Sequence, residues 1–325
     1  MPFALKCLSA AVASILALAV PASAQNYPER VVKVINPFPA GGSVDITARL
    51  LSQKLSEQTG HQFVVENRGG AGGNTGADAV AKSDPDGYTL LFTAPGPLVV
   101  NQKLFANGLP FDPEKDFTPI VLFATTPIVL MVNPNLPIKN VKELIDYSKA
   151  NPGKVNFGSA GMGSIPHLTG ELFKYMAKAD VTHVPYRGTA PAMNDLIAGH
   201  LQMFFDLLPG SLPQISAGKV RGIANAGSKR PASLPDLPTV AEQGLPGFDS
   251  SSWVAMVAPA KTPAPVLAKL RAEAAKALAS PDVAARIKEM GSETGTADEQ
   301  QIRAFFSSEQ KKWAEVIRVS GAKAE

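Results

Sequence analysis

The chain has 325 residues, of which 18% are charged, and its formal net charge is +3. Lysines and arginines are scattered among the acids, so the sequence shows no basic face for nucleic acid. The one cysteine, Cys7, lies near the amino terminus, which excludes a disulfide scaffold and a thiol nucleophile for the rest of the chain. The 28 prolines and 27 glycines predict many turns and short elements.

Residues 1–24 are interpreted as a cleaved export signal. Lys6 supplies a positive start, residues 8–20 form an apolar run, and a small-x-small triplet ends at Ala24. The apolar run stops at Pro21, short of the roughly 20 residues that a membrane span needs. Cleavage after Ala24 would leave an exported, cysteine-free chain of about 300 residues. That length predicts two domains of ordinary size.

The first part of this mature chain alternates short apolar runs with helical patterns, which favours parallel strands joined by right-handed crossovers. Strands are predicted over residues 31–36, 62–67 and 88–93. One helix follows the first strand, and an alanine-rich helix with a turn behind it occupies residues 76–87.

From residue 118 the pattern changes. A long β-rich run over residues 118–133, interrupted by Pro127, is interpreted as the chain leaving one lobe and entering another. Further helices are predicted over residues 141–150, 164–178, 190–199, 263–280 and 298–319, and further strands over residues 155–159, 181–186, 201–206, 220–226 and 251–259. The simplest topology has two α/β lobes between which the chain crosses twice. Lobe 1 would contain residues 27–122 and 245–325, and lobe 2 residues 123–244. The cleft between them is the expected ligand site.

Three glycine-rich turns, over residues 39–45, 67–78 and 156–167, each separate a predicted strand from a predicted helix. The carboxyl ends of strands are where open α/β sheets bind ligands. Helix N-termini there present unpaired N–H groups and a partial positive charge, which favours a carboxylate, sulfate or phosphate. Plain turn chemistry remains the alternative for each turn, because glycine and serine suit any strand-to-helix bend.

Specific enzyme motifs are absent from the sequence. The dinucleotide pattern G-x-G-x-x-G fails at Thr75, and a G-x-S-x-G nucleophile elbow fails at Phe157 and Met162. The phosphate-loop pattern is missing, and the four histidines form no zinc-binding spacing. The sequence therefore predicts no metal, no cofactor and no catalytic residue.

Several polar side chains have two interpretations. Asp45 either orders its glycine turn or meets a donor on the ligand, and a helix N-terminus favours an acid in any case. Asp206 ends a strand and is a candidate for the hinge or the site. Arg187 binds a carboxylate or lies on the surface, and His167 reaches the cleft or takes part in capping. His183, within a strand, is expected to be a core histidine with its hydrogen bonds made.

Five segments, in this order along the chain, carry a resemblance to a known family: residues 27–51, 64–92, 156–173, 183–206 and 234–248. The chain resembles the Bug family, the extracytoplasmic solute receptors of tripartite tricarboxylate transporters, over essentially all of its mature length. The resemblance implies an α/β, two-lobed periplasmic binding protein of the type II (Venus-flytrap) kind. Such a protein closes around a small carboxylate without catalysis. It is expected to be a monomer that serves membrane transporter subunits or a sensor kinase; a sensor role and a secreted enzyme on the same scaffold stay as alternatives.

The resemblance also implies a two-jawed ligand site. One jaw would contain Phe38, Ala40, Gly41 and Asp45, the other would contain Gly158, Ser159, Gly161, Gly163 and Ser164, and Thr93, Ala94, Gly188 and Asp206 would complete the lining. This sequence has prolines at positions 95 and 97, where many members show a loop rich in serine and threonine. The body of the ligand is therefore expected to meet an altered pocket, with carboxylate binding intact.

Overall fold

The computed structural model describes residues 27–105 and 107–323; the predicted export signal and Cys7 lie outside them. The strands are β1 (Val32–Asn36), β2 (Phe63–Asn67), β3 (Thr89–Thr93), β4 (Phe117–Val132), β5 (Asn156–Ser159), β6 (Thr182–Pro185), β7 (Met203–Leu207), β8 (Arg221–Asn225), β9 (Ser251–Pro259) and β10 (Glu293–Thr296). The helices are α2 (Ser43–Thr59), α3 (Asn74–Ala81), α4 (Asn101–Leu104), α5 (Val141–Ala150), α6 (Ile165–Ala177), α7 (Thr189–Ala198), α8 (Leu208–Ser216), α9 (Ala264–Ala279), α10 (Pro281–Glu289) and α11 (Glu299–Ser320). Two short turns of helix, η2 (Ala71–Gly73) and η3 (Gly96–Val100), complete the description. Among the described helices, none combines the length and apolar character that a membrane crossing needs.

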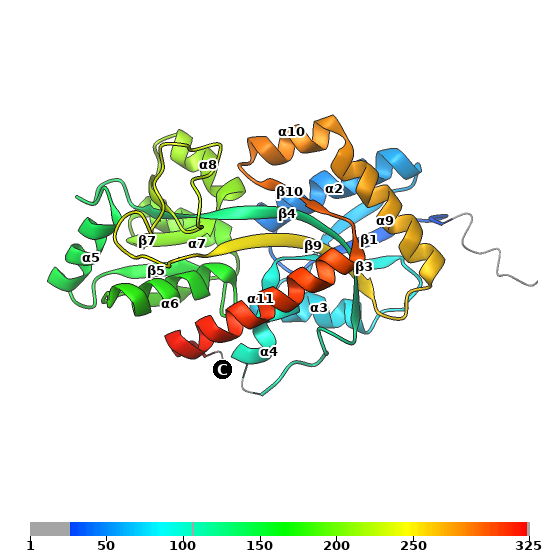
Figure 1. The fold of residues 1–325 in the computed structure, drawn as a ribbon, viewed down its shortest axis with the longest axis horizontal. Coiled ribbons are helices and arrows are strands. Elements are labelled where there is room, and N and C mark those ends of the chain that lie inside the picture. Colours follow the sequence, from blue (N-terminus) through cyan, green and yellow to red (C-terminus); the bar gives the residue numbers. More distant parts are fainter. Residues whose placement is uncertain (1–26, 106, 324–325) are drawn as a thin grey trace, which may run out of the picture.

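The described strands form one sheet in the order β2-β1-β3-β9-β4-β7-β5-β6, with β8 and β10 also paired to β4. Strands β2, β1 and β3 are parallel to one another, as are β6, β5 and β7. The two parallel groups form the sheets of two lobes, and β4 and β9 run between them through the middle of the molecule (Figure 1). The expected α/β architecture with parallel strands is therefore confirmed.

The predicted interruption at Pro127 is wrong, because β4 is one continuous strand of 16 residues. Its first part pairs with β9, and Pro127 lies opposite Ser251, the first residue of that strand. From Ile128 onward β4 pairs with β7, and from Val129 with β8. A proline lacks the N–H that a ladder needs, so it is tolerated where the strand changes partners.

The largest hydrophobic cluster joins the two lobes. It contains Ile35 and Leu91 from one lobe together with Phe157 and Phe205 from the other. Helix α11 lies along this cluster and packs against α6, η3 and β4 (Figure 1). The lobes are therefore connected on this side by continuous apolar packing.

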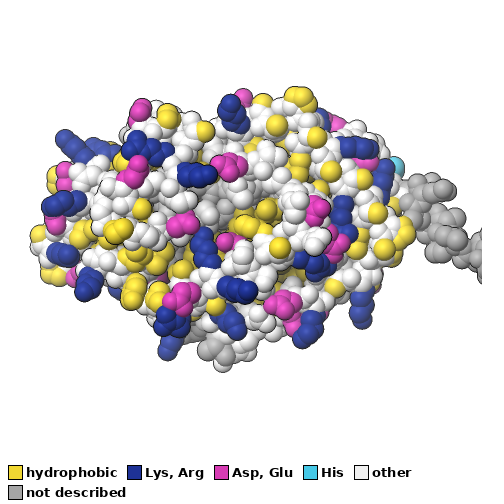
Figure 2. Space-filling model, in the orientation of Figure 1, with side chains coloured by type: hydrophobic (Ala, Val, Ile, Leu, Met, Phe, Trp, Pro, Cys, Tyr) yellow, Lys and Arg dark blue, Asp and Glu magenta, His cyan; other side chains and the backbone are white. Residues whose placement is uncertain are grey.

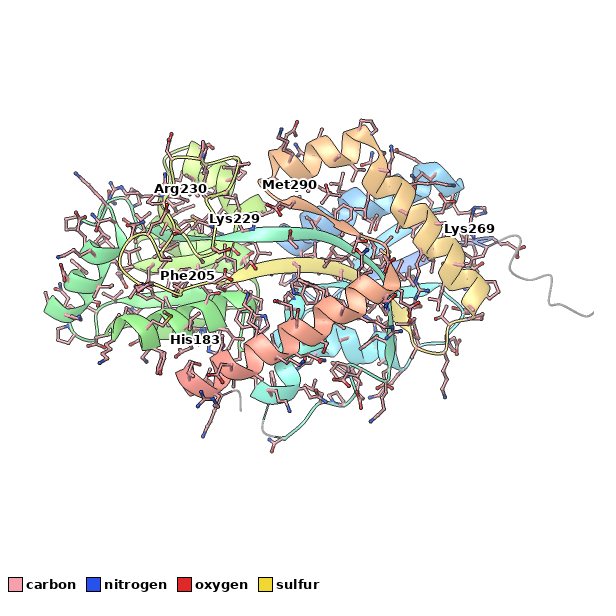
Figure 3. The ribbon with its side chains drawn as sticks, viewed as in Figure 1. His183, Phe205, Lys229, Arg230, Lys269 and Met290 are labelled. Atoms are coloured by element: carbon pink, nitrogen blue, oxygen red, sulfur yellow. The ribbon has the colours of Figure 1, made fainter. Side chains whose placement is uncertain are left out.

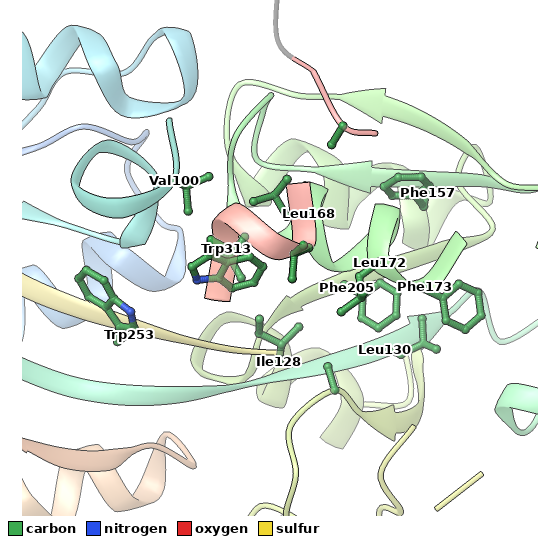
Figure 4. Packing of buried hydrophobic residues seen from close by; sticks show 14 of the residues in the cluster. Val100, Ile128, Leu130, Phe157, Leu168, Leu172, Phe173, Phe205, Trp253 and Trp313 are labelled. Atoms are coloured by element: carbon green, nitrogen blue, oxygen red, sulfur yellow. The ribbon is translucent and has the colours of Figure 1, made fainter. Parts of the chain in front are cut away.

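Two tryptophans anchor α11 within that cluster. Trp253, on β9, stacks on Phe306 of α11 with ring centroids 4.8 Å apart. The indole N–H groups of Trp253 and Trp313 both donate to Oε2 of Glu309, at 2.9 and 3.0 Å. Figure 4 shows Trp313 close to Val100 and Leu168, which belong to different lobes. The buried carboxylate is thus hydrogen-bonded where helix and crossing strand meet.

The two smaller hydrophobic clusters are built from different segments of the chain. One is built from residues 27–124 and 254–287, and the other from residues 129–220. Among the described residues, these two clusters share no buried apolar residue and form separate hydrophobic cores. On the face seen in Figure 2, Lys and Arg side chains are interspersed with Asp and Glu, in keeping with the scattered charges of the sequence.

Candidate functional site

A small cavity lies between the lobes. It is lined by residues 38–40, 42–44, 94, 96, 160, 164–166, 188–190, 207 and 252. The space that the centre of a water molecule can occupy is about 40 Å³, which is room for about three waters. Among the described residues, no charged side chain lines this cavity. Any net charge on a bound molecule would therefore be met by backbone groups and hydroxyls.

Besides α8, which follows the lining residue Leu207, three helices begin at the cavity. Gly42 precedes α2, Ser164 precedes α6 and Gly188 precedes α7, and none of these three residues caps its helix with a side-chain hydrogen bond. The N–H groups of a first helical turn have no partner within the helix, and they carry the positive end of the helix dipole. The cavity is therefore suited to an anionic oxygen.

The loop that leads into α2, residues 37–42 (the α2 loop), is held by a carboxylate. Asp45 Oδ2 accepts hydrogen bonds from the Gly41 N–H at 3.0 Å and from Arg49 Nε at 2.9 Å. Its Oδ1 accepts from Asn67 Nδ2 at 2.8 Å. Burial alone would raise the pKa of Asp45, but the hydrogen bonds from Arg49, Gly41 and Asn67 outweigh it and hold the pKa below its usual value. Asp45 therefore braces the loop with its acceptor positions occupied.

The loop that leads into α6, residues 160–164 (the α6 loop), is held by neutral groups. The Gly161 N–H donates to Ser159 Oγ at 3.1 Å, and that oxygen lies 2.7 Å from His183 Nε2. The Gly163 N–H donates to His167 Nδ1 at 3.2 Å. The two imidazoles are stacked with centroids 4.2 Å apart. His183, which lies in the same lobe as Phe205 (Figure 3), is half-buried and not the core residue that was expected, whereas its predicted hydrogen bonding is confirmed.

Burial keeps both imidazoles uncharged near neutral pH. It lowers the pKa of His167 to about 4. For His183, burial and then the neighbouring His167 lower the pKa to about 3. The capping interpretation of His167 fits its bond to Gly163, which requires an unprotonated Nδ1.

One serine joins the two lobes at the cavity. The Gly210 N–H at the start of α8 donates to Ser43 Oγ, 3.0 Å away, and Ser43 is the first residue of α2. The same hydroxyl donates to the Leu207 carbonyl oxygen at 3.4 Å. The lobes are therefore in direct polar contact beside the cavity.

A wider hollow adjoins the cavity and shares four lining residues with it. It offers about 560 Å³ by the same measure. Residues 69–73, from the second glycine-rich turn, line this outer hollow together with Gly161 and Met162 from the other lobe. Arg187 also lines this outer hollow and is exposed, as its surface interpretation expected.

The structure separates the predicted site residues into two groups. The first group lines the cavity and comprises Phe38, Ala40, Ala94, Ser164 and Gly188. The second group is outside that lining and comprises Gly41, Asp45, Thr93, Gly158, Ser159, Gly161, Gly163 and Asp206. Hydrogen bonds within the loops engage the N–H groups of Gly41, Gly161 and Gly163.

Asp206 lies next to the lining residue Leu207 and is itself 1% exposed. Its Oδ2 accepts from Ser211 Oγ at 3.4 Å, and Oδ1 has no hydrogen-bond partner among the described residues. Burial raises the pKa of Asp206 to about 7, against weaker opposing hydrogen bonds from Leu207 and Ser211. Its carboxyl group is therefore partly protonated near neutral pH.

Among the lining residues that sequence reasoning missed, three carry a hydroxyl group: Ser43, Thr189 and Ser252. Ser43 and Thr189 are the first residues of α2 and α7, and each directly follows a glycine. The prediction centred on the glycines and therefore stopped one residue short of these hydroxyl groups. Ser252 is a polar residue in the apolar run of β9, where it alternates with the core residue Trp253. This alternation of a polar and an apolar residue is the sequence signal that could have identified Ser252 as a lining residue.

The fold and the cavity define a two-lobed α/β binding protein whose ligand site lies between its lobes. The family model described as tripartite tricarboxylate transporter family receptor matches residues 47–322. The chain is 38% identical over 307 residues to protein BugT of Bordetella pertussis (strain Tohama I), covering 94% of each protein. The chain belongs to this receptor family, so the expected relationship to Bug proteins and the two-lobed fold are confirmed.

Two solved structures show the same fold. The R. palustris protein Rpa4515 with adipate has a TM-score of 0.89 and 37% identity, covering 91% of this chain and 99% of that one. MatC (Rpa3494) from Rhodopseudomonas palustris with bound malate has a TM-score of 0.85 and 33% identity, covering 90% of this chain and 100% of that one. The family and these neighbours are solute-binding proteins.

Proposed function

We propose that this receptor captures a small carboxylate between its lobes and delivers it to a membrane transporter. The observation that carries the proposal is the convergence of three helix N-termini, from both lobes, on a cavity without charged side chains. Hydrogen bonds to a charged oxygen are strong in a site from which water is excluded. The adipate and malate named for the two structural neighbours are ligands of this class.

The N–H groups that remain for a ligand are those of the first helical turns. Ser43 and Val44 offer them from α2, and Thr189 and Ala190 from α7. Phe38, Ala40, Ala94, Ser164 and Gly188 supply the surrounding contact surface. Among the other predicted site residues, Asp45 holds the α2 loop through Gly41, and Ser159 holds the α6 loop through Gly161.

Ligand binding closes the lobes because the ligand touches both of them. We assign residues 27–122 and 245–325 to one lobe and residues 123–244 to the other. The receptor works as a periplasmic monomer after cleavage at Ala24, alters no covalent bond of its ligand, and serves transporter subunits or a sensor kinase.

Calorimetry and thermal unfolding with a panel of mono-, di- and tricarboxylates, malate and adipate included, test the proposal. At least one carboxylate should raise the unfolding temperature, since a ligand at 100 times its Kd adds about 2.7 kcal/mol to the free energy of unfolding. The ligand should be recovered unchanged by mass spectrometry. A panel without any shift, combined with product formation from one of its members, would contradict a receptor role.

Closure can be tested at Gly72, where a Cβ atom would lie 2.2 Å from the Met162 carbonyl oxygen of the other lobe. Gly72→Ala should therefore weaken binding at least about tenfold, because closure no longer brings the lobes together. Gly60→Ala is the matched control: its φ is +72°, close to the +62° of Gly72, and nothing lies within 4 Å of its Cβ. Equal affinities in the two variants would show that this contact does not form on binding.

A further inference from the structure

Ser252 is a buried hydroxyl group in the wall of the cavity. The residue is 1% exposed and lies on β9, one of the two strands that run between the lobes. Its Oγ has no hydrogen-bond partner among the described residues. A buried hydroxyl without a partner is costly, and alanine would fill nearly the same space without that cost. The position thus favours a partner that reaches the hydroxyl from the cavity.

The neighbouring hydroxyl groups already have partners. Ser250 Oγ lies 2.7 Å from Thr169 Oγ1. Thr126, which stands opposite Ser252 in the β4–β9 ladder, has its Oγ1 engaged by Ser292 at 3.3 Å. The next residue along β9, Trp253, points to the opposite face of the sheet and donates to Glu309. Among the residues that line the cavity, Ser252 is the one whose buried hydroxyl has no partner in the part of the chain that the structure describes.

We infer that Ser252 is a ligand-binding residue, which donates its hydroxyl hydrogen to an oxygen atom of the bound carboxylate. This inference rests on the proposed function. The helix N-termini of α2, α6 and α7 meet the ligand from the two lobes, and Ser252 meets it from the strand between them. The ligand that fits must place a second hydrogen-bonding oxygen toward β9. This selects carboxylates with a further carboxylate, hydroxyl or carbonyl group over simple alkyl acids.

The test compares Ser252→Ala with Ser52→Ala. Ser52 is 2% exposed and also carries a hydroxyl group without a partner, but it lies on α2 in a hollow outside the cleft. In the absence of ligand, neither substitution should lower the unfolding temperature, because each removes an unpaired buried hydroxyl. Wild type and both variants are then titrated by calorimetry with malate, adipate, succinate and butyrate.

Ser252→Ala should raise the Kd of the preferred dicarboxylate by about ten- to a hundredfold, the range expected for a hydrogen bond to a charged group. Ser52→Ala should leave it unchanged. Unchanged affinity in Ser252→Ala, with normal binding by wild type, would overturn the inference and leave the receptor function standing. Absence of binding by wild type for every acid tested would instead overturn the proposed function, and the inference with it.

Discussion

The α2 loop and the α6 loop do the same work by different chemistry. Both turn a strand into a helix whose N-terminus faces the cavity. The α2 loop is braced by an ionised carboxylate, Asp45, that receives a guanidinium, an amide and a backbone N–H. The α6 loop is braced by a serine hydroxyl and two stacked neutral imidazoles.

The difference shows that a cavity without charged side chains in its lining can still depend on a charged residue behind that lining. Asp45 is 4% exposed, while its partner Arg49 has a side chain that is 54% exposed. The negative charge is therefore neutralised from the solvent side, and it does not compete with an anionic ligand for the helix N-terminus. The α6 loop needs no such screening, because its supports carry no charge near neutral pH.

Acidification should give the largest difference between the two loops in what their bracing residues contribute to the free energy of unfolding. In the folded protein the pKa values of His167 and His183 are about 4 and about 3, against 6.5 in the unfolded chain. As the pH falls below 6.5 the unfolded state takes up protons first. The free energy of unfolding then decreases by up to about 1.4 kcal/mol per pH unit for each histidine. The contribution of Asp45, whose pKa is lowered, is lost only below its usual 3.8.

Urea unfolding of wild type and His183→Gln between pH 7 and pH 4 measures this effect. The variant should show a shallower decrease, because one of the two groups no longer titrates. The raised pKa of Asp206 acts in the opposite sense over about the same range, and it cancels in the difference since both proteins contain it. Parallel curves would show that His183 is freely protonated in the folded protein.

Removing the charge from the α2 loop should have the next largest effect. Asp45→Asn turns an amide NH₂ toward groups that are themselves donors, so it should lower the free energy of unfolding at pH 7 by about 2–4 kcal/mol. Asp146→Asn is the control, because that carboxylate pairs with Lys142 in the open, with 59% of its side chain exposed. The control should lose less than about 1 kcal/mol. Similar losses in both variants would show that the brace adds nothing beyond a surface pair.

Removing the neutral brace should cost less. Ser159→Ala leaves the Gly161 N–H and His183 without their shared partner, and no charge is left unpaired. The expected decrease in the free energy of unfolding is about 1–2 kcal/mol, with a weaker ligand-induced shift in the unfolding temperature. Ser56→Ala, which removes a hydroxyl bonded to the Phe63 N–H away from the cleft, should show a similar stability loss and an unchanged ligand shift. A loss in Ser159→Ala equal to that of Asp45→Asn would remove the distinction between the loops.

Most of the fold could be predicted from the hydrophobic pattern of the sequence. The strands β1, β2, β3 and β9 were expected within about one residue of where they lie, because each is a short apolar run bounded by turns. Helix α8 was missed, since Pro209, Gly210 and Pro213 read as a loop. Proline near a helix start suits the first turn, and packing against β4 and α2 stabilises the rest.

The site was harder to predict than the fold. The glycine positions located the α2 loop and the α6 loop. They do not show which backbone N–H groups are already hydrogen-bonded within each loop. That depends on where Asp45, Ser159 and His167 lie in three dimensions. Ser252 was missed because its burial against the cavity depends on β9 crossing between the lobes, which is a property of the whole sheet.

The bond between Glu309 and the two indoles has a spectroscopic consequence. Trp253 and Trp313 are the only tryptophans of the chain, and neither lines the cavity. Both share one carboxylate oxygen at the junction of β9 and α11. A change in the tryptophan emission of this receptor on ligand binding should therefore report on rearrangement at the junction of β9 and α11, and not on direct contact with the solute.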